Sequence, residues 1–99
     1  GAAGNSTAMT IRFAANVPTG ANIDVYRKTK LSSDPQNFDT VNWVLVGTVG
    51  STNASGFSEK EFRVTNIDAF DQMAVKLVMR SSSCAYIPKA KDLIVVANA

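Results

Sequence analysis

The sequence contains no histidine, so it lacks the commonest general base near neutral pH and the commonest transition-metal ligand of proteins. This absence excludes hydrolysis by a Ser-His-Asp or Cys-His arrangement. The single cysteine, Cys84, has no partner for an intramolecular disulfide, so packing alone must hold the fold, as suits folding in a reducing compartment. Without a histidine neighbour we expect Cys84 to be an inert thiol, and one cysteine with carboxylates matches no common zinc ligand set.

Long apolar runs are absent as well. No stretch reaches the roughly 18 to 20 residues that a membrane-spanning helix needs, and no charged start followed by an apolar run marks a signal peptide. We therefore expect no membrane insertion.

Charge is scarce and mixed. Charged residues make up 18% of the sequence, and ten Lys or Arg against eight Asp or Glu give a net charge of +2. Nucleic-acid binders concentrate basic side chains on one face, so we expect no nucleic-acid partner. The nearest basic cluster is Arg80 with Lys89 and Lys91, which we interpret as a solvated face, with a phosphate site as the alternative.

Hydrophobic residues are plentiful, at 45% of 99 residues, which indicates one folded core. The small and polar residues 1–7 are expected to be a linker or a remnant of cloning, and residues 8–99 a single domain.

Apolar side chains alternate with a period of two in segment after segment, which favours strands over helices. Alternating strands are predicted over residues 9–15, 23–26, 61–65 and 73–80. The runs 43–46 and 93–97 are apolar throughout, so we expect strands covered on both faces, with Trp43 in the core. A short extra strand is predicted at Tyr86 and Ile87, and a turn of helix over residues 66–70.

The spacing of strands and turns predicts an all-β fold, an antiparallel β-sandwich of jelly-roll or immunoglobulin-like type with about seven to eight strands. The loops over residues 28–41 and 47–58 show no helical periodicity and are long for a domain of this size. Loops of such length tend to carry function or an interface.

The carboxylates show no sign of catalytic pairing. Most lie in polar loops, where nothing apolar would raise a pKa, so we expect solvated acids and no enzyme activity. Asp68 with Asp71, and Asp34 with Asp39, are close enough in sequence to suggest a loop calcium site, but they lack the regular spacing of a calcium loop. We favour turn chemistry and expect no cofactor.

Sugar recognition is the main binding alternative. Sugar-binding sandwiches stack an exposed ring on the sugar, and the available rings are Tyr26, Tyr86 and Trp43. Because Trp43 is expected in the core, Tyr86 is the better surface candidate.

The C-terminal third resembles a known family of modules. The segments that carry this resemblance are Glu61–Val64, Ile67–Ser83 and Ile87–Ala97, with Val25–Thr29, Phe38–Asp39 and Trp43 upstream. They are similar to a C-terminal β-sandwich module of virion structural proteins (baseplate, tail or fibre) of contractile-tailed bacteriophages, especially cyanophages. The similarity covers residues 22–97 and is strongest over 73–97. The departures from the family pattern are Cys84, Ala85, Tyr86 and Ala90.

The resemblance implies a non-catalytic component of a virion, folded in the host cytoplasm, that docks on other virion proteins or on its own copies. It brings no catalytic residues. Two further hypotheses accompany it. Arg80 and Asp92 end and open neighbouring predicted strands, so they could form a structural ion pair that fixes strand register. A ligand or interface role is expected, if anywhere, at Tyr86, Tyr26, Arg80, Lys89 and Lys91, with a host-surface glycan as the alternative partner.

Overall fold

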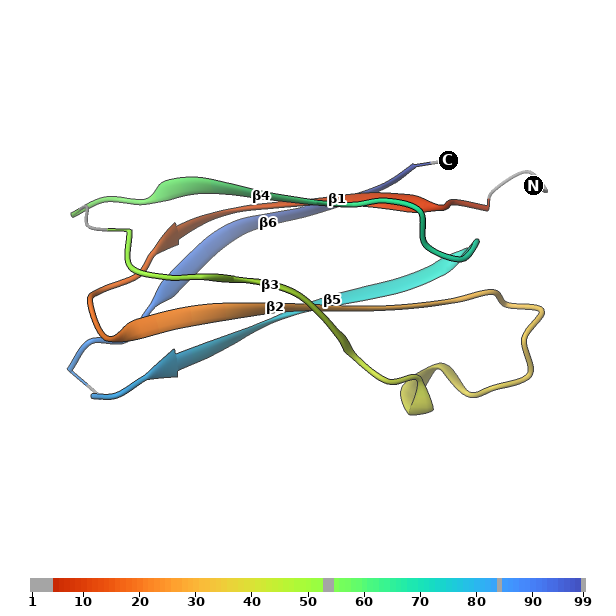
Figure 1. Ribbon diagram of the computed structural model, residues 1–99, viewed down its shortest axis with the longest axis horizontal. Coiled ribbons are helices and arrows are strands. Elements are labelled where there is room, and N and C mark those ends of the chain that lie inside the picture. The colour runs from red at the N-terminus through yellow and green to blue at the C-terminus, as the bar shows by residue number, and fades with distance from the viewer. Residues whose placement is uncertain (1–4, 53–54, 84, 99) are drawn as a thin grey trace.

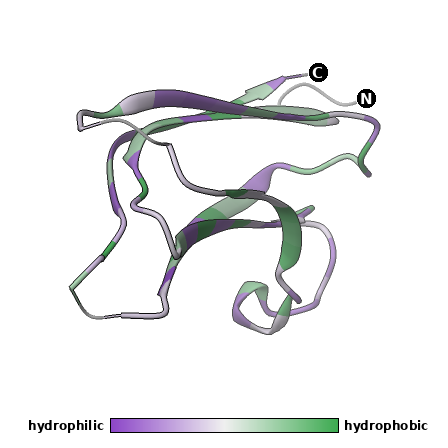
Figure 2. Ribbon diagram, turned by 60° about the vertical axis from the view of Figure 1, so that its left-hand side comes forward, coloured by the Kyte–Doolittle hydropathy of each residue, from purple (hydrophilic) through white to green (hydrophobic). Residues whose placement is uncertain are grey.

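A computed structural model shows two three-stranded antiparallel sheets stacked face to face (Figures 1 and 2). It describes residues 5–52, 55–83 and 85–98. The elements are β1 (Ala8–Asn16), β2 (Ala21–Lys30), the 3-10 turn η1 (Phe38–Thr40), β3 (Val44–Val49), β4 (Ser58–Val64), β5 (Gln72–Ser81) and β6 (Lys89–Asn98). One sheet has the order β4-β1-β6 and the other β3-β2-β5. The predicted antiparallel β-sandwich is confirmed.

The core lies between the two central strands. Met9, Ile11 and Phe13 of β1 and Ile23 and Val25 of β2 are almost fully buried, as their alternation predicted. Partly buried side chains from all four outer strands complete the cluster. The sandwich is elongated, measuring 46 × 24 × 19 Å, so the core is a narrow band along the two central strands.

The two long flanks of the sandwich differ. On the flank of β3 and β4 the sheets approach closely, because Gly47 of β3 has no side chain and leaves room for the ring of Phe62. On the flank of β5 and β6 the inward-facing side chains Met73, Val75 and Leu77 are only partly buried, and Met79 is exposed. The second flank therefore remains open.

Two strand placements expected from sequence are wrong. The runs around Trp43–Val46 and Leu93–Ala97 were expected to be covered on both faces, yet β3 and β6 are edge strands. Val44 and Leu45 are 45% and 54% exposed, and Leu93, Ile94 and Val96 are 44%, 56% and 50% exposed. An unbroken apolar run is compatible with a buried central strand but does not require one.

The loops also differ from expectation. Tyr86 lies in a bend and Ile87 in irregular backbone, not in a strand, so the described residues contain six strands and an isolated bridge, against about seven to eight predicted. Residues 66–70 form no helical turn, and Asn66 has a φ of 56° instead. The only helical turn in the described segments is η1, inside the loop judged non-helical, where the Asn37 side chain accepts a hydrogen bond from the Asp39 backbone. None of these elements is a helix able to cross a bilayer.

The segment expected to be a linker is partly integrated into the fold. Ser6 exchanges two backbone hydrogen bonds with Phe70, both of 2.8 Å, and the Thr7 amide donates to the Asn98 carbonyl at 2.9 Å. Residues 1–4 and Cys84 lie outside the described part of the chain.

Candidate functional site

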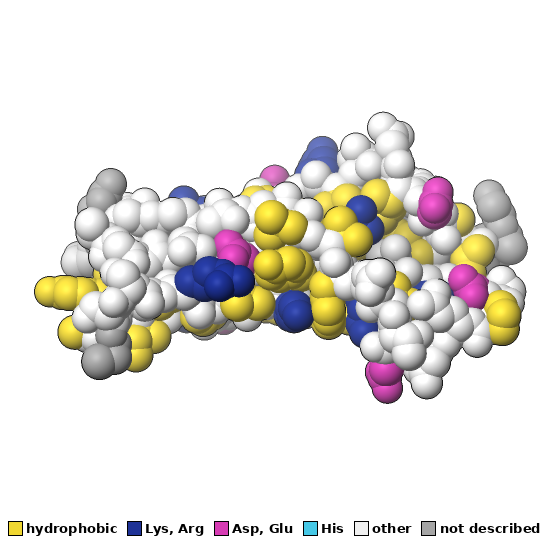
Figure 3. Space-filling model, turned by 60° about the horizontal axis from the view of Figure 1, so that its bottom comes forward, with side chains coloured by type: hydrophobic (Ala, Val, Ile, Leu, Met, Phe, Trp, Pro, Cys, Tyr) yellow, Lys and Arg dark blue, Asp and Glu magenta, His cyan; other side chains and the backbone are white. Residues whose placement is uncertain are grey.

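The outer face of the β3-β2-β5 sheet carries a network of side-chain hydrogen bonds and a group of cation–π contacts. Alternation along β2 sends its polar side chains outward, and the register places neighbours from β3 and β5 beside them. Figure 3 shows hydrophobic side chains gathered in the middle of this side of the molecule, with Lys and Arg side chains among them.

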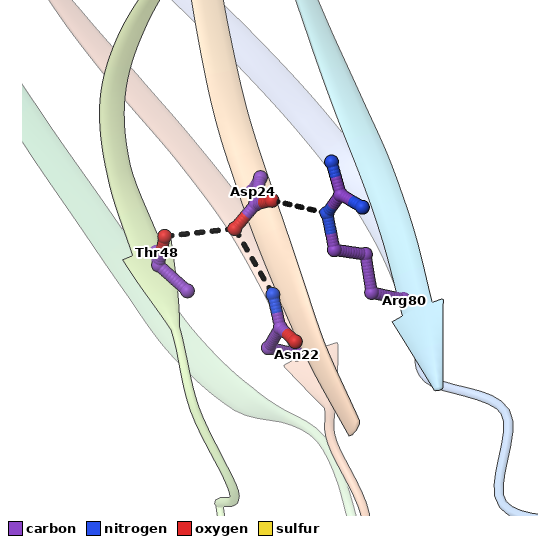
Figure 4. A network of polar contacts seen from close by, with 4 residues as sticks. All are labelled: Asn22, Asp24, Thr48 and Arg80. Carbon is purple, nitrogen blue, oxygen red and sulfur yellow. Dashed lines mark hydrogen bonds and ion pairs between the residues drawn. The ribbon is translucent and has the colours of Figure 1, made fainter. Parts of the chain in front are cut away.

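At one end of this face Asp24 joins all three strands (Figure 4). Its carboxylate accepts hydrogen bonds from Thr48 Oγ1 of β3 at 2.8 Å, from Asn22 Nδ2 at 3.0 Å and from Arg80 Nε of β5 at 2.6 Å. The hydroxyl of Thr48, followed by the guanidinium of Arg80, holds the pKa of Asp24 below its usual value. Asp24 and, after it, the Tyr26 hydroxyl raise the pKa of Arg80. The Asp24 carboxylate therefore has all three of these hydrogen-bond partners within its own sheet.

Further along the face, two lysines approach one indole ring. The ammonium of Lys28 lies 4.8 Å from the ring centre of Trp43 and 4.6 Å from that of Phe38, and it donates to the Phe38 carbonyl at 3.0 Å. The ammonium of Lys76 lies 4.5 Å from the Trp43 ring centre and 5.2 Å from that of Tyr26. We call these five residues the Trp43 cluster.

The loop between β2 and β3 builds the cluster. Residues 31–43 bring η1 and Trp43 back over the outer face of β2, which leaves Lys28 only 7% exposed although it points away from the core. Lys76 reaches the same ring from β5, on the opposite side of β2 from β3. The expected core position of Trp43 is thus wrong, because the aromatic contacts of its ring are with lysines on the outer face.

The predicted ion pair between Arg80 and Asp92 does not form. Arg80 faces outward from the β3-β2-β5 sheet, where Asp24 binds it, and Asp92 lies in the other sheet at a register shift of β6, with a φ of 58°. A left-handed residue at a β-bulge is a favourable place for aspartate. Asp92 therefore serves strand geometry.

The other residues proposed from sequence are dispersed. Tyr26 and Arg80 meet on the face just described. Lys91 lies on the outer face of the opposite sheet, 4.3 Å from the ring centre of Phe57, and Lys89 begins the same strand. The basic group of Arg80, Lys89 and Lys91 is consequently divided between two faces. Tyr86 is 58% exposed in the loop between β5 and β6, where Ser81 Oγ donates to its carbonyl at 2.7 Å.

Among the acids considered for calcium, the Asp71 carboxylate is occupied by hydrogen bonds within the protein. Asp71 accepts from the Ser32 amide at 2.7 Å and from its hydroxyl at 2.6 Å, and these two bonds lower the pKa of Asp71. Asp34 and Asp68 line one surface hollow, where the ammonium of Lys30 donates to the Asp34 carbonyl at 2.6 Å. Within the ranges that the structure describes, no three acidic or thiol side chains gather at one point.

A second surface lies on β6. Its segment Leu93–Ala97, which we call the apolar half of β6, ends an otherwise charged edge strand. Ile94 and Val96 face outward and border a shallow hollow of about 280 Å³ over the central strand. The remaining lining residues are Thr10, Arg12, Arg63 and Asn98.

Sequence reasoning missed Lys28 and Lys76 as site residues. The alternation did place both on the polar faces of predicted strands, but nothing in the sequence shows that their strands are neighbours. Comparison with protein-family models, curated proteins and solved structures finds no match to this chain.

Proposed function

We propose that this domain is a non-catalytic assembly module of a phage virion, in a tail, baseplate or fibre protein, that docks on its own copies or on other virion proteins. The observation that supports assembly is the exposed apolar half of β6 at a free sheet edge. The virion context is supported by the sequence resemblance.

The edges of the sandwich are protected unequally. Natural sheets guard their edges against pairing with charges, prolines and bulges. The edge strand β4 carries alternating acidic and basic residues over Glu59–Arg63, and the first half of β6 carries Lys89, Lys91 and the bulge at Asp92. The apolar half of β6 has no charge and no proline, and the register irregularity reaches only its first residue, Leu93. The edge strand β3 also lacks charge and proline, but its register irregularity falls in the middle of the strand, and the edge strand β5 carries Lys76 and Arg80. The end of β6 is therefore the longest regular and uncharged stretch of sheet edge for another strand to add to.

A second copy offers a matching strand. In an antiparallel pair centred on Val95, Ile94 lies opposite Val96 of the second copy, and Leu93 lies opposite its Ala97. The charged residues of each strand, Lys89, Lys91 and Asp92, lie outside this paired segment, so no like charges face each other. Apolar cross-strand pairs of this kind stabilise a sheet by roughly 0.2 to 1 kcal/mol each.

Sedimentation tests the role of β6. We expect the wild-type domain to self-associate with rising concentration and Ile94→Lys to remain monomeric, because the charge opposes pairing at the edge and the apolar contact with Val96 of the second copy is lost. Val44→Lys is the matched control, since it places the same charge on the exposed β3 edge. Equal association of wild type and Ile94→Lys, or a wild type that stays monomeric throughout, would contradict the proposed role of β6.

Recognition of a host-surface glycan is a second candidate, supported by the exposure of Tyr86 in the loop between β5 and β6, a loop that lies at one end of the sandwich (Figure 1). A glycan array probed with wild type and Tyr86→Ala tests it. Binding that is independent of this ring would remove Tyr86 as the platform.

A further inference from the structure

The Trp43 cluster holds two cations that no carboxylate of the described residues neutralises. The ion pairs of the described residues are Arg12 with Glu61 and Arg80 with Asp24, and neither Lys28 nor Lys76 lies within 4 Å of an acidic oxygen in that part of the chain. Asp24, the acid on the same face, already accepts three hydrogen bonds. Two like charges therefore lie against one indole ring, and the part of the chain that the structure describes supplies no counter-charge within 4 Å.

Contacts with the loop between β2 and β3 hold the ammonium of Lys28 in place. Lys28 is nearly buried, and its ammonium is held by the Phe38 carbonyl and two rings. A nearly buried ammonium without an anionic partner is costly, and a bound anion would reduce both this cost and the repulsion between the two lysines. The cluster is thus preorganised for a negatively charged group.

The surroundings of the cluster narrow the class of ligand. Leu45 lies opposite Tyr26 in the pairing of β2 and β3 and is 54% exposed, so an apolar side chain adjoins the cluster on the same outer face. A nucleic acid needs several phosphates neutralised in a row, whereas Arg80 is bound to Asp24 and Lys30 donates to two backbone carbonyls. A peptide that binds through its backbone would pair with the edge of β3 and would lie beside the outer face of the sheet. It would therefore not cover the Trp43 cluster.

We infer that the Trp43 cluster is a binding site for an acidic saccharide, whose carboxylate is held by the exposed ammonium of Lys76, close to the charge of the nearly buried Lys28, while its C–H surface lies on Leu45. A uronic acid unit combines both features in one compact group. This site lies apart from Tyr86 and from β6, so it does not depend on assembly through the apolar half of β6.

Tryptophan fluorescence gives a direct readout, because Trp43 is the only tryptophan of the sequence. The experiment titrates the full chain, in the Ile94→Lys form that uncouples binding from assembly, with oligogalacturonate. The same oligosaccharide with its carboxylates methyl-esterified is the uncharged probe, and oligothymidylate is the phosphate probe.

We expect saturable binding of oligogalacturonate that weakens with salt. The affinity of Lys76→Met should be about tenfold lower, because this variant lacks one charged partner. Lys76 is exposed, so this variant should fold even if Lys28→Met does not. Lys91→Met is the matched control, because it removes an ammonium that lies over a ring on the opposite sheet.

Three results would overturn the inference: no binding of oligogalacturonate, equal binding of its methyl ester, or unchanged affinity in Lys76→Met. Tighter binding of oligothymidylate than of the uronate would also overturn it, in favour of a nucleic-acid surface. Sedimentation of the wild type is measured separately, so a failure of assembly is not confused with a failure of this site.

Discussion

Replacing Gly47 by alanine tests how closely the two sheets pack on the flank of β3 and β4. A Cβ atom at this position would lie 2.6 Å from Cε1 and 3.2 Å from Cδ1 of Phe62. Carbon atoms pack favourably at about 3.5 Å or more, so the ring would have to move by roughly 1 Å. Its path is limited, because the Phe62 ring stacks on the fully buried ring of Phe13 at a centroid distance of 6.3 Å.

Overpacking of this kind costs about 1 to 3 kcal/mol. In a domain of this size each kcal/mol lowers the melting temperature by about 4 to 8 °C. We therefore expect Gly47→Ala to lower both the urea midpoint and the melting temperature clearly. Gly50→Ala is the control, because no atom lies within 4 Å of its added Cβ and its φ is not positive.

The double variant Gly47→Ala/Phe62→Leu identifies the cause. Phe62→Leu alone should destabilise by about 1 to 2 kcal/mol, because it removes buried ring atoms. The pair should lose less than the sum of the single changes, because the smaller side chain makes room for the new methyl group. Wild-type stability in Gly47→Ala, or strict additivity of the pair, would refute the close approach of the two sheets.

Three further predictions concern polar and backbone features. Because the folded-state pKa of Asp24 is lowered below 3.8, its contribution to stability is present above that pH and is lost as the pH falls through the folded value. Urea titrations at pH 5 and below should show a larger loss of stability in wild type than in Asp24→Asn, which retains only the contribution of other acids such as Asp71. Asp71→Asn should speed hydrogen exchange at the Ser32 amide, because the charged oxygen that accepts from this amide is lost. Unchanged exchange would contradict this hydrogen bond. Asp92→Gly should preserve the melting temperature, while Asp92→Val should cost about 1 to 2 kcal/mol because its φ of 58° disfavours a β-branched residue.

The central strands could be predicted from sequence because their pattern has one interpretation. Ile11 and Phe13 alternate with polar or small residues, and so do Ile23 and Val25, so each strand buries one face whatever its neighbours are. The run Leu93–Ala97 has no such alternation, and its burial depends on whether a strand lies on each side of it. In this fold β1 lies on one side, and no strand of the described residues lies on the other.

The polar contacts were less accessible to prediction because they depend on register. The sequence contains eight acidic residues that could pair with Arg80. The strand register selects Asp24, because it places Arg80 opposite Asn22 and Thr48 opposite Asp24, so that Arg80 and Thr48 reach Asp24 from its two sides. Trp43 was assigned to the core from its apolar neighbours, whereas the loop over residues 31–43 returns it to the outer face of β2. Long-range strand order, which decides both cases, leaves no local signature in the sequence.

The two proposed surfaces occupy opposite layers of the sandwich, and this arrangement permits them to act together. Ile94 and Val96 face outward from the β4-β1-β6 sheet, while Lys28 and Lys76 face outward from the β3-β2-β5 sheet. Pairing of copies through β6 would extend one sheet without covering the Trp43 cluster. A single site with two cations should bind an acidic chain weakly, but copies joined through β6 would present several such sites to one polymer, and linked sites bind more tightly than their separate affinities. Wild type should therefore retain a long polyuronate at lower concentrations than Ile94→Lys does, while both bind a short oligomer equally.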